Sequence, residues 1–494
     1  MAAGVALPRT EAPPDPASAR NAPQGGFLSA AEAPVSTISL HGDTASYSVV
    51  RRLLLDGSWP RLGSGAERFV RAEEFINAFP YDYPLPDDRA QPFAPFVSVH
   101  PSPWNPARRL LHVGLRTAAP VARPRVNLTL LLDVSGSMAP PDRLPLVVDA
   151  MRGLVERLGP GDRVAIVTYA GKTAVTLPPT PADRRPEIET ALASLRAEGG
   201  TSGGAGLALA YDQAAKSFEP GAVNRVVLAT DGDFNLGVTS PQALADMVTQ
   251  RRRGGIYLTT LGVGLDNLND TRMSAIARAG NGTYIYASTP AEARRALIED
   301  FAANVIPVAD DVKAQVEFNP ALVSQYRLIG YETRVLRRED FRDDSVDAGE
   351  IGSGRSVTAL YEFIPRGGEP AVDPLRYAPA ARTSPVPRSG EFAYLRLRYK
   401  LPGEARSRET VRAITPRDAR PDFEAASGDA RFAAAVAGFA QRLRASPHVR
   451  GWSCRDMAAI ASAALGRDED GRRAEFVTLV RSVAAQPGGP CAGP

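Results

Sequence analysis

The chain has little cysteine, histidine and lysine for its 494 residues. It contains 2 cysteines and 4 histidines, and lysine occurs only at Lys172, Lys216, Lys313 and Lys400 among 58 basic residues. The two cysteines are too few for a disulfide framework and form no CxxC pair, which excludes zinc-ribbon and thioredoxin-type chemistry. The histidines form no HExxH pattern, which excludes that class of zinc protease.

The sequence also lacks long runs of apolar or like-charged residues. No apolar run approaches the roughly 18 residues that a membrane-spanning helix needs, and the opening MAAGVALPRTEAPPDP lacks the apolar centre of an export signal. The 58 basic and 55 acidic residues give a net charge of +3 without a basic arm. We therefore expect no transmembrane segment and no nucleic-acid partner.

Common catalytic motifs are missing as well. The segment AGKT at 170–173 resembles the end of a phosphate-binding loop, but the glycine that this loop needs at 166 is Ile166, within a predicted strand. The spacing G-x-S-x-G occurs at 200–204 (GTSGG), but no apolar run precedes it directly, as the strand before a hydrolase nucleophile would. We therefore expect a protein without enzymatic activity.

What is present is a composition typical of several folded units. Hydrophobic residues make up 44% of the chain, with 43 glycines and 43 prolines that indicate many turns. The expected organisation is a disordered lead at 1–34, a helical then stranded region at 35–122, an α/β domain at 123–305, a β-rich domain at 306–415 and a helical segment at 416–494.

The α/β domain is predicted from short apolar runs that alternate with helical patterns. These runs are VNLTLLL (126–132), RVAIVTYA (163–170), TAVTL (173–177), RVVLAT (225–230), IYLTTLGVG (256–264) and GTYIYA (282–287). Strands that are apolar on both faces favour a doubly wound, mostly parallel sheet with helices on both sides. Such sheets bind ligands at the carboxyl ends of their strands.

Oxygen-bearing side chains gather at these expected strand ends. Asp133, Ser135 and Ser137 follow the first run, Thr201 lies in a glycine-rich loop, and Asp231 follows the fourth run. A set of oxygens without histidine or cysteine suits Mg²⁺, with Mn²⁺ or Ca²⁺ as substitutes.

The pattern D-x-S-x-S, then a threonine in a glycine-rich loop, then T-D-G resembles the metal-ion-dependent adhesion site of von Willebrand factor type A (VWA) domains. The resemblance implies that Asp133, Ser135, Ser137, Thr201 and Asp231 surround the ion, some of them through water. Two carboxylates with three hydroxyls leave one coordination position for an outside oxygen, and a carboxylate from a protein partner is the favoured occupant.

The flanking segments resemble a narrower set, the bacterial YfbK-like VWA proteins. The resemblance rests on DTASYSVVRR (43–52), RAEEFINAFPYDYP (71–84), PWNPAR (103–108), VEFNPALVSQYRLIGYE (316–332) and DAGEIGSGRSVTALYE (347–362). It implies an extracytoplasmic setting (periplasm or cell envelope). The strand patterns on both sides of the VWA domain suggest one sandwich into which that domain is inserted. Family members tend to have D-V-D-T-A-S-Y where this chain has His41-Gly42-Asp43 before Thr44.

These observations favour a divalent-cation-dependent adhesion or scaffold protein. Two alternatives are an accessory subunit of a separate AAA+ type ATPase and a structural protein of the envelope. Asp233 and the acidic stretch at 340–350 are read as loop residues rather than as a second ion site. By analogy with VWA receptors, we hypothesise that ligation is coupled to a shift of the last helix, here about 290–304. No residue pattern specifies an oligomeric state.

Overall fold

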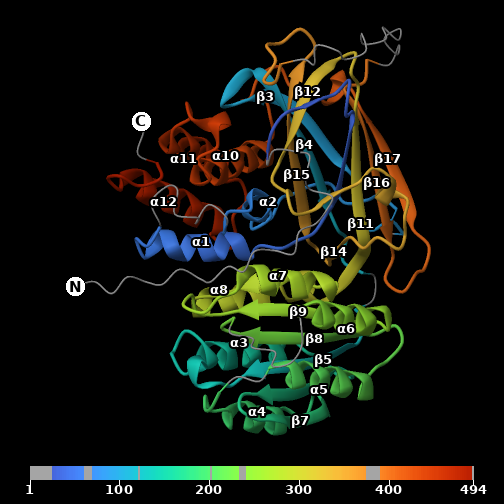
Figure 1. Ribbon diagram of the computed structural model, residues 1–494, viewed down its shortest axis with the longest axis vertical. Coiled ribbons are helices and arrows are strands. Elements are labelled where there is room, and N and C mark those ends of the chain that lie inside the picture. The colour runs from blue at the N-terminus through green and yellow to red at the C-terminus, as the bar shows by residue number, and fades with distance from the viewer. Residues whose placement is uncertain are drawn as a thin grey trace.

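The structure, a computed structural model, describes residues 25–59, 69–88, 90–120, 123–200, 203–232, 241–373 and 390–491. An α/β domain, a sandwich of antiparallel sheets and a layer of C-terminal helices pack against one another (Figure 1).

The α/β domain is built on a sheet with the order β10-β9-β8-β5-β6-β7, in which only β7 runs antiparallel to its neighbour. Every residue of β5 and β8 is buried, because helices cover both faces of these strands. The strands are β5 (Val126–Asp133), β6 (Arg163–Tyr169), β7 (Thr173–Pro181), β8 (Val223–Thr230), β9 (Ile256–Gly262) and β10 (Tyr284–Tyr286).

Alternate side chains of β5 enter separate hydrophobic cores on the two faces of this sheet. Leu130 and Leu132 pack with α3, α4, α8 and α9, whereas Leu131 packs with α5 and α6. The helices are α3 (Leu144–Glu156), α4 (Arg185–Ala193), α5 (Gly203–Lys216), α6 (Pro241–Arg253), α7 (Asp270–Ala279), α8 (Pro290–Arg294) and α9 (Phe301–Val305), with a π-helical turn over Arg295–Glu299. The doubly wound architecture expected from the sequence is confirmed.

The sandwich consists of one sheet with the order β1-β12-β15-β4-β3 and a second with the order β13-β2-β11-β16-β17, in which β14 also pairs with β11. Its strands are β1 (Leu28–Ser29), β2 (Val35–Ser39), β3 (Phe96–Ser102), β4 (Asn105–Arg116), β11 (Pro307–Phe318), β12 (Val323–Ile329), β13 (Val335–Leu336), β14 (Gly349–Gly352), β15 (Ser356–Pro365), β16 (Ala393–Lys400) and β17 (Arg408–Ile414). The α/β domain is inserted between β4 and β11, which lie in different sheets.

The structure differs from the expected disordered lead in one respect. Leu28–Ser29 pairs with β12 as β1, so residues 25–34 belong to the sandwich, while residues 1–24 lie outside the described ranges.

The terminal helices form a layer on the outer face of the first sheet. Phe432, Phe439 and Phe476 pack with Phe75 and Phe79 in one aromatic core. The helices are α1 (Ala45–Leu55), α2 (Ala72–Ile76), α10 (Gly428–Leu443), α11 (Cys454–Ala463) and α12 (Arg472–Ala485). The amphipathic helices expected in the tail are thus present, and a disulfide joins Cys454 to Cys491.

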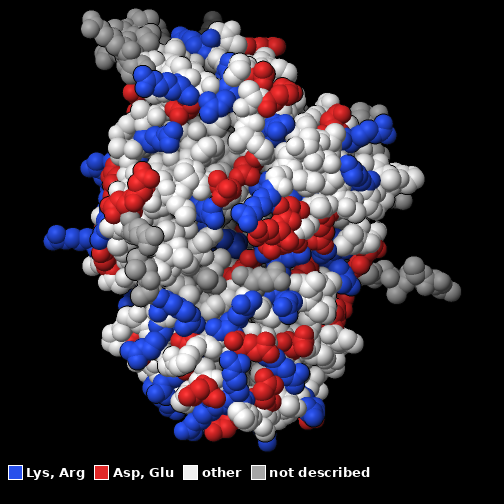
Figure 2. Space-filling view, turned by 180° about the vertical axis from the view of Figure 1, so that it is seen from behind, with Lys and Arg blue, Asp and Glu red and all other residues white. Residues whose placement is uncertain are grey.

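Charged residues dominate the junction between the sandwich and the α/β domain. Arg225 of β8 is fully buried and donates to Glu350 of β14 over 2.7 Å and to Thr259 over 2.8 Å. Arg252 pairs with Asp347 nearer the surface. Residues of the acidic stretch 340–350 thus serve as interdomain partners, and basic and acidic side chains mingle along this level of the molecule (Figure 2).

The buried acids of this junction resist ionisation. Burial raises the pKa of Glu350 to about 7 although Arg225 opposes the shift. Burial also raises the pKa of Asp310 to about 6, and its side chain accepts a hydrogen bond of 3.1 Å from the Tyr257 hydroxyl.

Candidate functional site

The first part of the candidate site is Asp133, the last residue of β5. Its Oδ1 accepts a hydrogen bond of 3.0 Å from the Ser135 backbone N–H. Its Oδ2 accepts from the Thr230 hydroxyl at 2.9 Å and from the Tyr169 hydroxyl at 3.2 Å. Burial raises the pKa of Asp133, while the hydrogen bonds from Ser135 and Thr230 favour its ionised form. The carboxylate is therefore held at the carboxyl end of the central strand by its two neighbouring strands, β6 and β8.

The two serines of the same loop present their hydroxyls to each other. The Oγ atoms of Ser135 and Ser137 are 3.0 Å apart, within a loop that turns through a short 3-10 helix at Gly136–Met138. Neighbouring oxygen ligands of an octahedral Mg²⁺ lie about 3.0 Å apart when each bond is about 2.1 Å. The spacing of the two hydroxyls therefore fits adjacent positions around such an ion.

Asp231 is the residue that follows β8, and it is fully buried. Its Oδ2 accepts hydrogen bonds from Arg143 Nη1 at 2.9 Å and from Asn267 Nδ2 at 3.3 Å. The next residue, Gly232, has φ +98° and packs so closely on the backbone of Asn267 that an added Cβ would lie 2.7 Å from its carbonyl oxygen. Glycine is therefore required after this aspartate.

Thr201 and Asp233 lie outside the described residues. The glycine-rich segment before Thr201 reaches the serine loop, because the Gly136 N–H donates to the Gly199 carbonyl over 3.0 Å. The structure thus brings together Asp133, Ser135, Ser137 and, through Arg143, Asp231.

Arg143 is a side chain of the candidate site that the sequence analysis did not identify. It is 6% exposed and donates to the Ser137 carbonyl over 2.6 Å, to Asp231 over 2.9 Å and to Asp266 over 2.7 Å. It stands just before α3 and belongs to no motif, so no sequence signal marks it. The hydroxyl donor Thr230, in contrast, is the first residue of T-D-G and could have been found there.

These residues fit a hard divalent cation. The serine hydroxyls and the Asp133 carboxylate share one loop, and neither sulfur nor imidazole is among them. In the described part of the chain, no group of three or more His, Cys, Asp or Glu side chains lies close enough to hold a metal. Any ion here would therefore depend on hydroxyl and water oxygens as well as carboxylates.

Asp43, which follows the departing residues His41 and Gly42, lies at the domain junction. The Asp43 carboxylate accepts a hydrogen bond of 3.0 Å from the Tyr284 backbone N–H and one of 2.6 Å from Arg334. Burial lowers the pKa of His41 to about 4, so its ring is neutral at pH 7 and Arg334 is the cation that pairs with Asp43.

Comparisons with known proteins define the class first. The family model of the von Willebrand factor type A domain matches residues 127–301, and a second model described as von Willebrand factor matches residues 17–112. The chain therefore contains a VWA domain, which implies a role in protein interaction or adhesion.

The narrower family follows from the rest of the chain. The model described as the C-terminal part of the uncharacterized protein YfbK matches residues 303–485. The chain is 42% identical over 458 residues to the uncharacterized protein YfbK of Escherichia coli strain K12, covering 91% of this chain and 78% of that protein. The chain belongs to the YfbK family.

Two solved structures match this chain at low identity. A von Willebrand factor type A protein from Catenulispora acidiphila is 17% identical, with 82% of this chain and 91% of that one covered and a TM-score of 0.44. The ArnB paralog VWA2 from Sulfolobus acidocaldarius is 14% identical, with 81% and 95% covered and a TM-score of 0.37. Within the described ranges, no helix is both long and apolar enough to cross a bilayer.

Proposed function

We propose that this protein binds a protein partner through a divalent cation, Mg²⁺ by preference with Mn²⁺ or Ca²⁺ as substitutes, held by Asp133, Ser135, Ser137, Thr201 and Asp231. The observation that carries the proposal is the pair of hydroxyls 3.0 Å apart beside the Asp133 carboxylate, at the carboxyl end of the central strand. The ion would supply an electrophilic position for an outside oxygen.

The partner that suits this position carries an acidic side chain. The Asp133 carboxylate is already occupied by hydrogen bonds from Ser135, Thr230 and Tyr169, and Asp231 faces the cation of Arg143. The site therefore directs little unshared negative charge toward solvent, and a carboxylate would complete the coordination of the ion by displacing only water. These contacts support binding rather than chemical conversion.

The disulfide supports an extracytoplasmic location for this function. Cys454 and Cys491, whose Cα atoms are 5.7 Å apart, tie α11 to the end of the chain. Disulfides persist in oxidising compartments and are rare in the cytosol of most organisms. We infer that the protein acts in the periplasm or cell envelope.

Metal binding is tested by calorimetric titration of Mg²⁺ into wild-type protein and the variants Asp133→Ala and Thr201→Ala. We expect the two variants to bind at least about 100-fold more weakly, because each loses an oxygen that orients or holds the ion. The matched control is Asp246→Ala, which removes an exposed carboxylate of α6 outside the site. Equal binding by wild type, control and both variants would refute the assignment.

Partner binding is tested by a pull-down with the tagged protein in Mg²⁺ and in EDTA. We expect a partner that wild type and Asp246→Ala retain in Mg²⁺ and lose in EDTA, and that Asp133→Ala fails to retain. A partner retained equally with EDTA and by Asp133→Ala would contradict a metal bridge. That outcome, with copurification of an ATPase, would favour the accessory-subunit alternative.

A further inference from the structure

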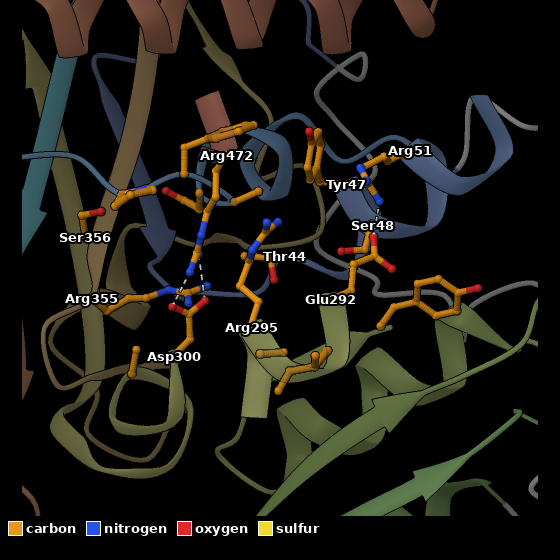
Figure 3. A pocket seen from close by; sticks show the side chains of 18 of the residues that line it. Thr44, Tyr47, Ser48, Arg51, Glu292, Arg295, Asp300, Arg355, Ser356 and Arg472 are labelled. Atoms are coloured by element: carbon orange, nitrogen blue, oxygen red, sulfur yellow. Dashed lines mark hydrogen bonds and ion pairs between the residues drawn. The ribbon is translucent and has the colours of Figure 1, made fainter. Parts of the chain in front are cut away.

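A cavity of about 120 Å³ lies where the last helical segment of the VWA domain meets α1, α12 and the start of β15 (Figure 3). Arg51 comes from α1, Arg295 from the π-helical turn after α8, Arg355 from the turn before β15 and Arg472 from α12. Four guanidinium groups from four separate segments thus line one small space.

The carboxylates that line the cavity are committed to three of these arginines. Both oxygens of Asp300 accept from Arg472, at 2.8 and 2.9 Å. Glu292 and Glu475 both pair with Arg51, and Glu475 also accepts 3.3 Å from Arg295.

The remaining cation, Arg355, lacks an anionic partner. Its Nη2 donates to the carbonyl oxygen of Gly42. Among the described residues, its guanidinium pairs with no carboxylate, and its Nε is shielded from solvent without a hydrogen-bond acceptor. Burial lowers the pKa of Arg355, and neighbouring Arg472 lowers it further against the attraction of Asp300.

A buried donor without an acceptor is unfavourable, and more so when it carries charge. The lining contains Arg51, Arg295, Arg355 and Arg472 against Glu292, Asp300 and Glu475, so the positive groups exceed the negative ones by one. Asp470, which does not line the cavity, is a second partner of Arg472 at 3.3 Å, so Arg355 is the lining cation without a carboxylate among the described residues. An anion in the cavity would supply that partner.

We propose that this cavity binds a small oxyanion, either free phosphate or the carboxylate of a small molecule. Its volume has room for such a group. Arginine presents parallel donors that match the oxygens of a phosphate or carboxylate. The bound anion bridges the last helical segment of the VWA domain to the helices and sandwich that hold it.

This site is independent of the metal site, since none of Asp133, Ser135, Ser137 or Asp231 lines it. Its local geometry also depends on Gly42, because a Cβ at this position would lie 2.8 Å from Arg355 Nε. Gly42→Ala therefore displaces Arg355 while all four guanidinium groups are kept.

The test titrates inorganic phosphate, and separately acetate, into the full chain by calorimetry at constant ionic strength set with chloride. We expect wild type to bind at least one anion, and Arg355→Ala and Gly42→Ala to bind it at least about tenfold more weakly. Arg355→Lys should bind with intermediate affinity, because it keeps the charge and loses the paired donors. Phosphate binding alone indicates a phosphate ligand, and acetate binding alone indicates a carboxylate ligand.

Two controls make the result decisive. Arg52→Ala removes a charge from the same helix outside the cavity, and Asp133→Ala disables only the proposed metal site, so both should bind the anion as wild type does. If Arg355→Ala fails to fold, Gly42→Ala and Arg355→Lys carry the comparison. The absence of anion binding by wild type at about 10 mM, where a millimolar site would be saturated, overturns the proposal. Equal binding by all folded Arg355 and Gly42 variants overturns it as well.

Discussion

Replacing the buried Arg225 should separate the VWA domain from the sandwich more readily than replacing its surface counterpart. Arg225 and Arg252 both reach from the VWA domain to the segment 347–350. The side chains of Arg225 and Glu350 are 0% and 6% exposed, whereas those of Arg252 and Asp347 are 14% and 37% exposed. The two ion pairs therefore form a matched comparison across one interface.

The magnitudes differ because an isolated buried charge cannot regain its water. Removing one partner of a buried pair costs about 3–5 kcal/mol, whereas a surface pair contributes about 0–1 kcal/mol. We expect Arg225→Met to weaken the docking of the two domains by about 3–5 kcal/mol and Arg252→Met to weaken it by about 0–1 kcal/mol. The double variant Arg225→Met with Glu350→Leu should recover most of the loss, because no charge is then left buried. The raised pKa of Glu350 agrees with a pair whose desolvation offsets much of its attraction.

The assay is hydrogen–deuterium exchange of peptides covering β14, which carries Glu350, and β9, whose Thr259 accepts a hydrogen bond from Arg225. A loss of about 3 kcal/mol corresponds to exchange faster by about 100-fold, and a loss of up to 1 kcal/mol to less than about tenfold. Equal acceleration of exchange by Arg252→Met and Arg225→Met would refute this prediction. Exchange in the double variant as fast as in Arg225→Met alone would refute it as well.

Three further predictions concern stability. Burial beside Glu332 and Glu74 raises the pKa of Glu73 from 4.5 to about 7. The folded protein therefore holds this proton more tightly than the unfolded chain, and its free energy of unfolding falls as pH rises from 4.5 through 7. Glu73→Gln should therefore increase the free energy of unfolding by about 3 kcal/mol at pH 8 and have little effect at pH 4, measured by urea denaturation; an equal effect at both pH values would contradict this. Replacing both Cys454 and Cys491 by serine should lower the free energy of unfolding by about 4 kcal/mol, since the disulfide closes a loop of 37 residues. An unchanged urea midpoint would argue against this. Arg143→Met should increase the stabilisation that Mg²⁺ confers in thermal unfolding, because the Asp231 carboxylate loses its guanidinium partner and can bind the ion more strongly. A smaller stabilisation by Mg²⁺ than in wild type would count against the proposed ion.

Much of the fold could be predicted because its signals are local. The apolar runs at 126–132 and 225–230 became β5 and β8, and the stripe of Phe432, Val436 and Phe439 became the buried face of α10. The proximity of Asp133 to the end of β8 also followed from the sequence, because adjacent parallel strands end at one edge. The short β1 was missed, since a two-residue strand has no periodicity to detect.

Local patterns along the chain thus decided the type of most elements and the candidate metal ligands, since each element and each ligand loop is marked by residues a few positions apart. The tertiary structure alone decided which distant charges meet. Arg143 facing Asp231, Arg225 facing Glu350 and the unpartnered Arg355 each depend on segments brought together by packing. No periodicity in the sequence predicts these contacts, because they form only when burial of the surrounding core offsets the entropic cost of closing long loops.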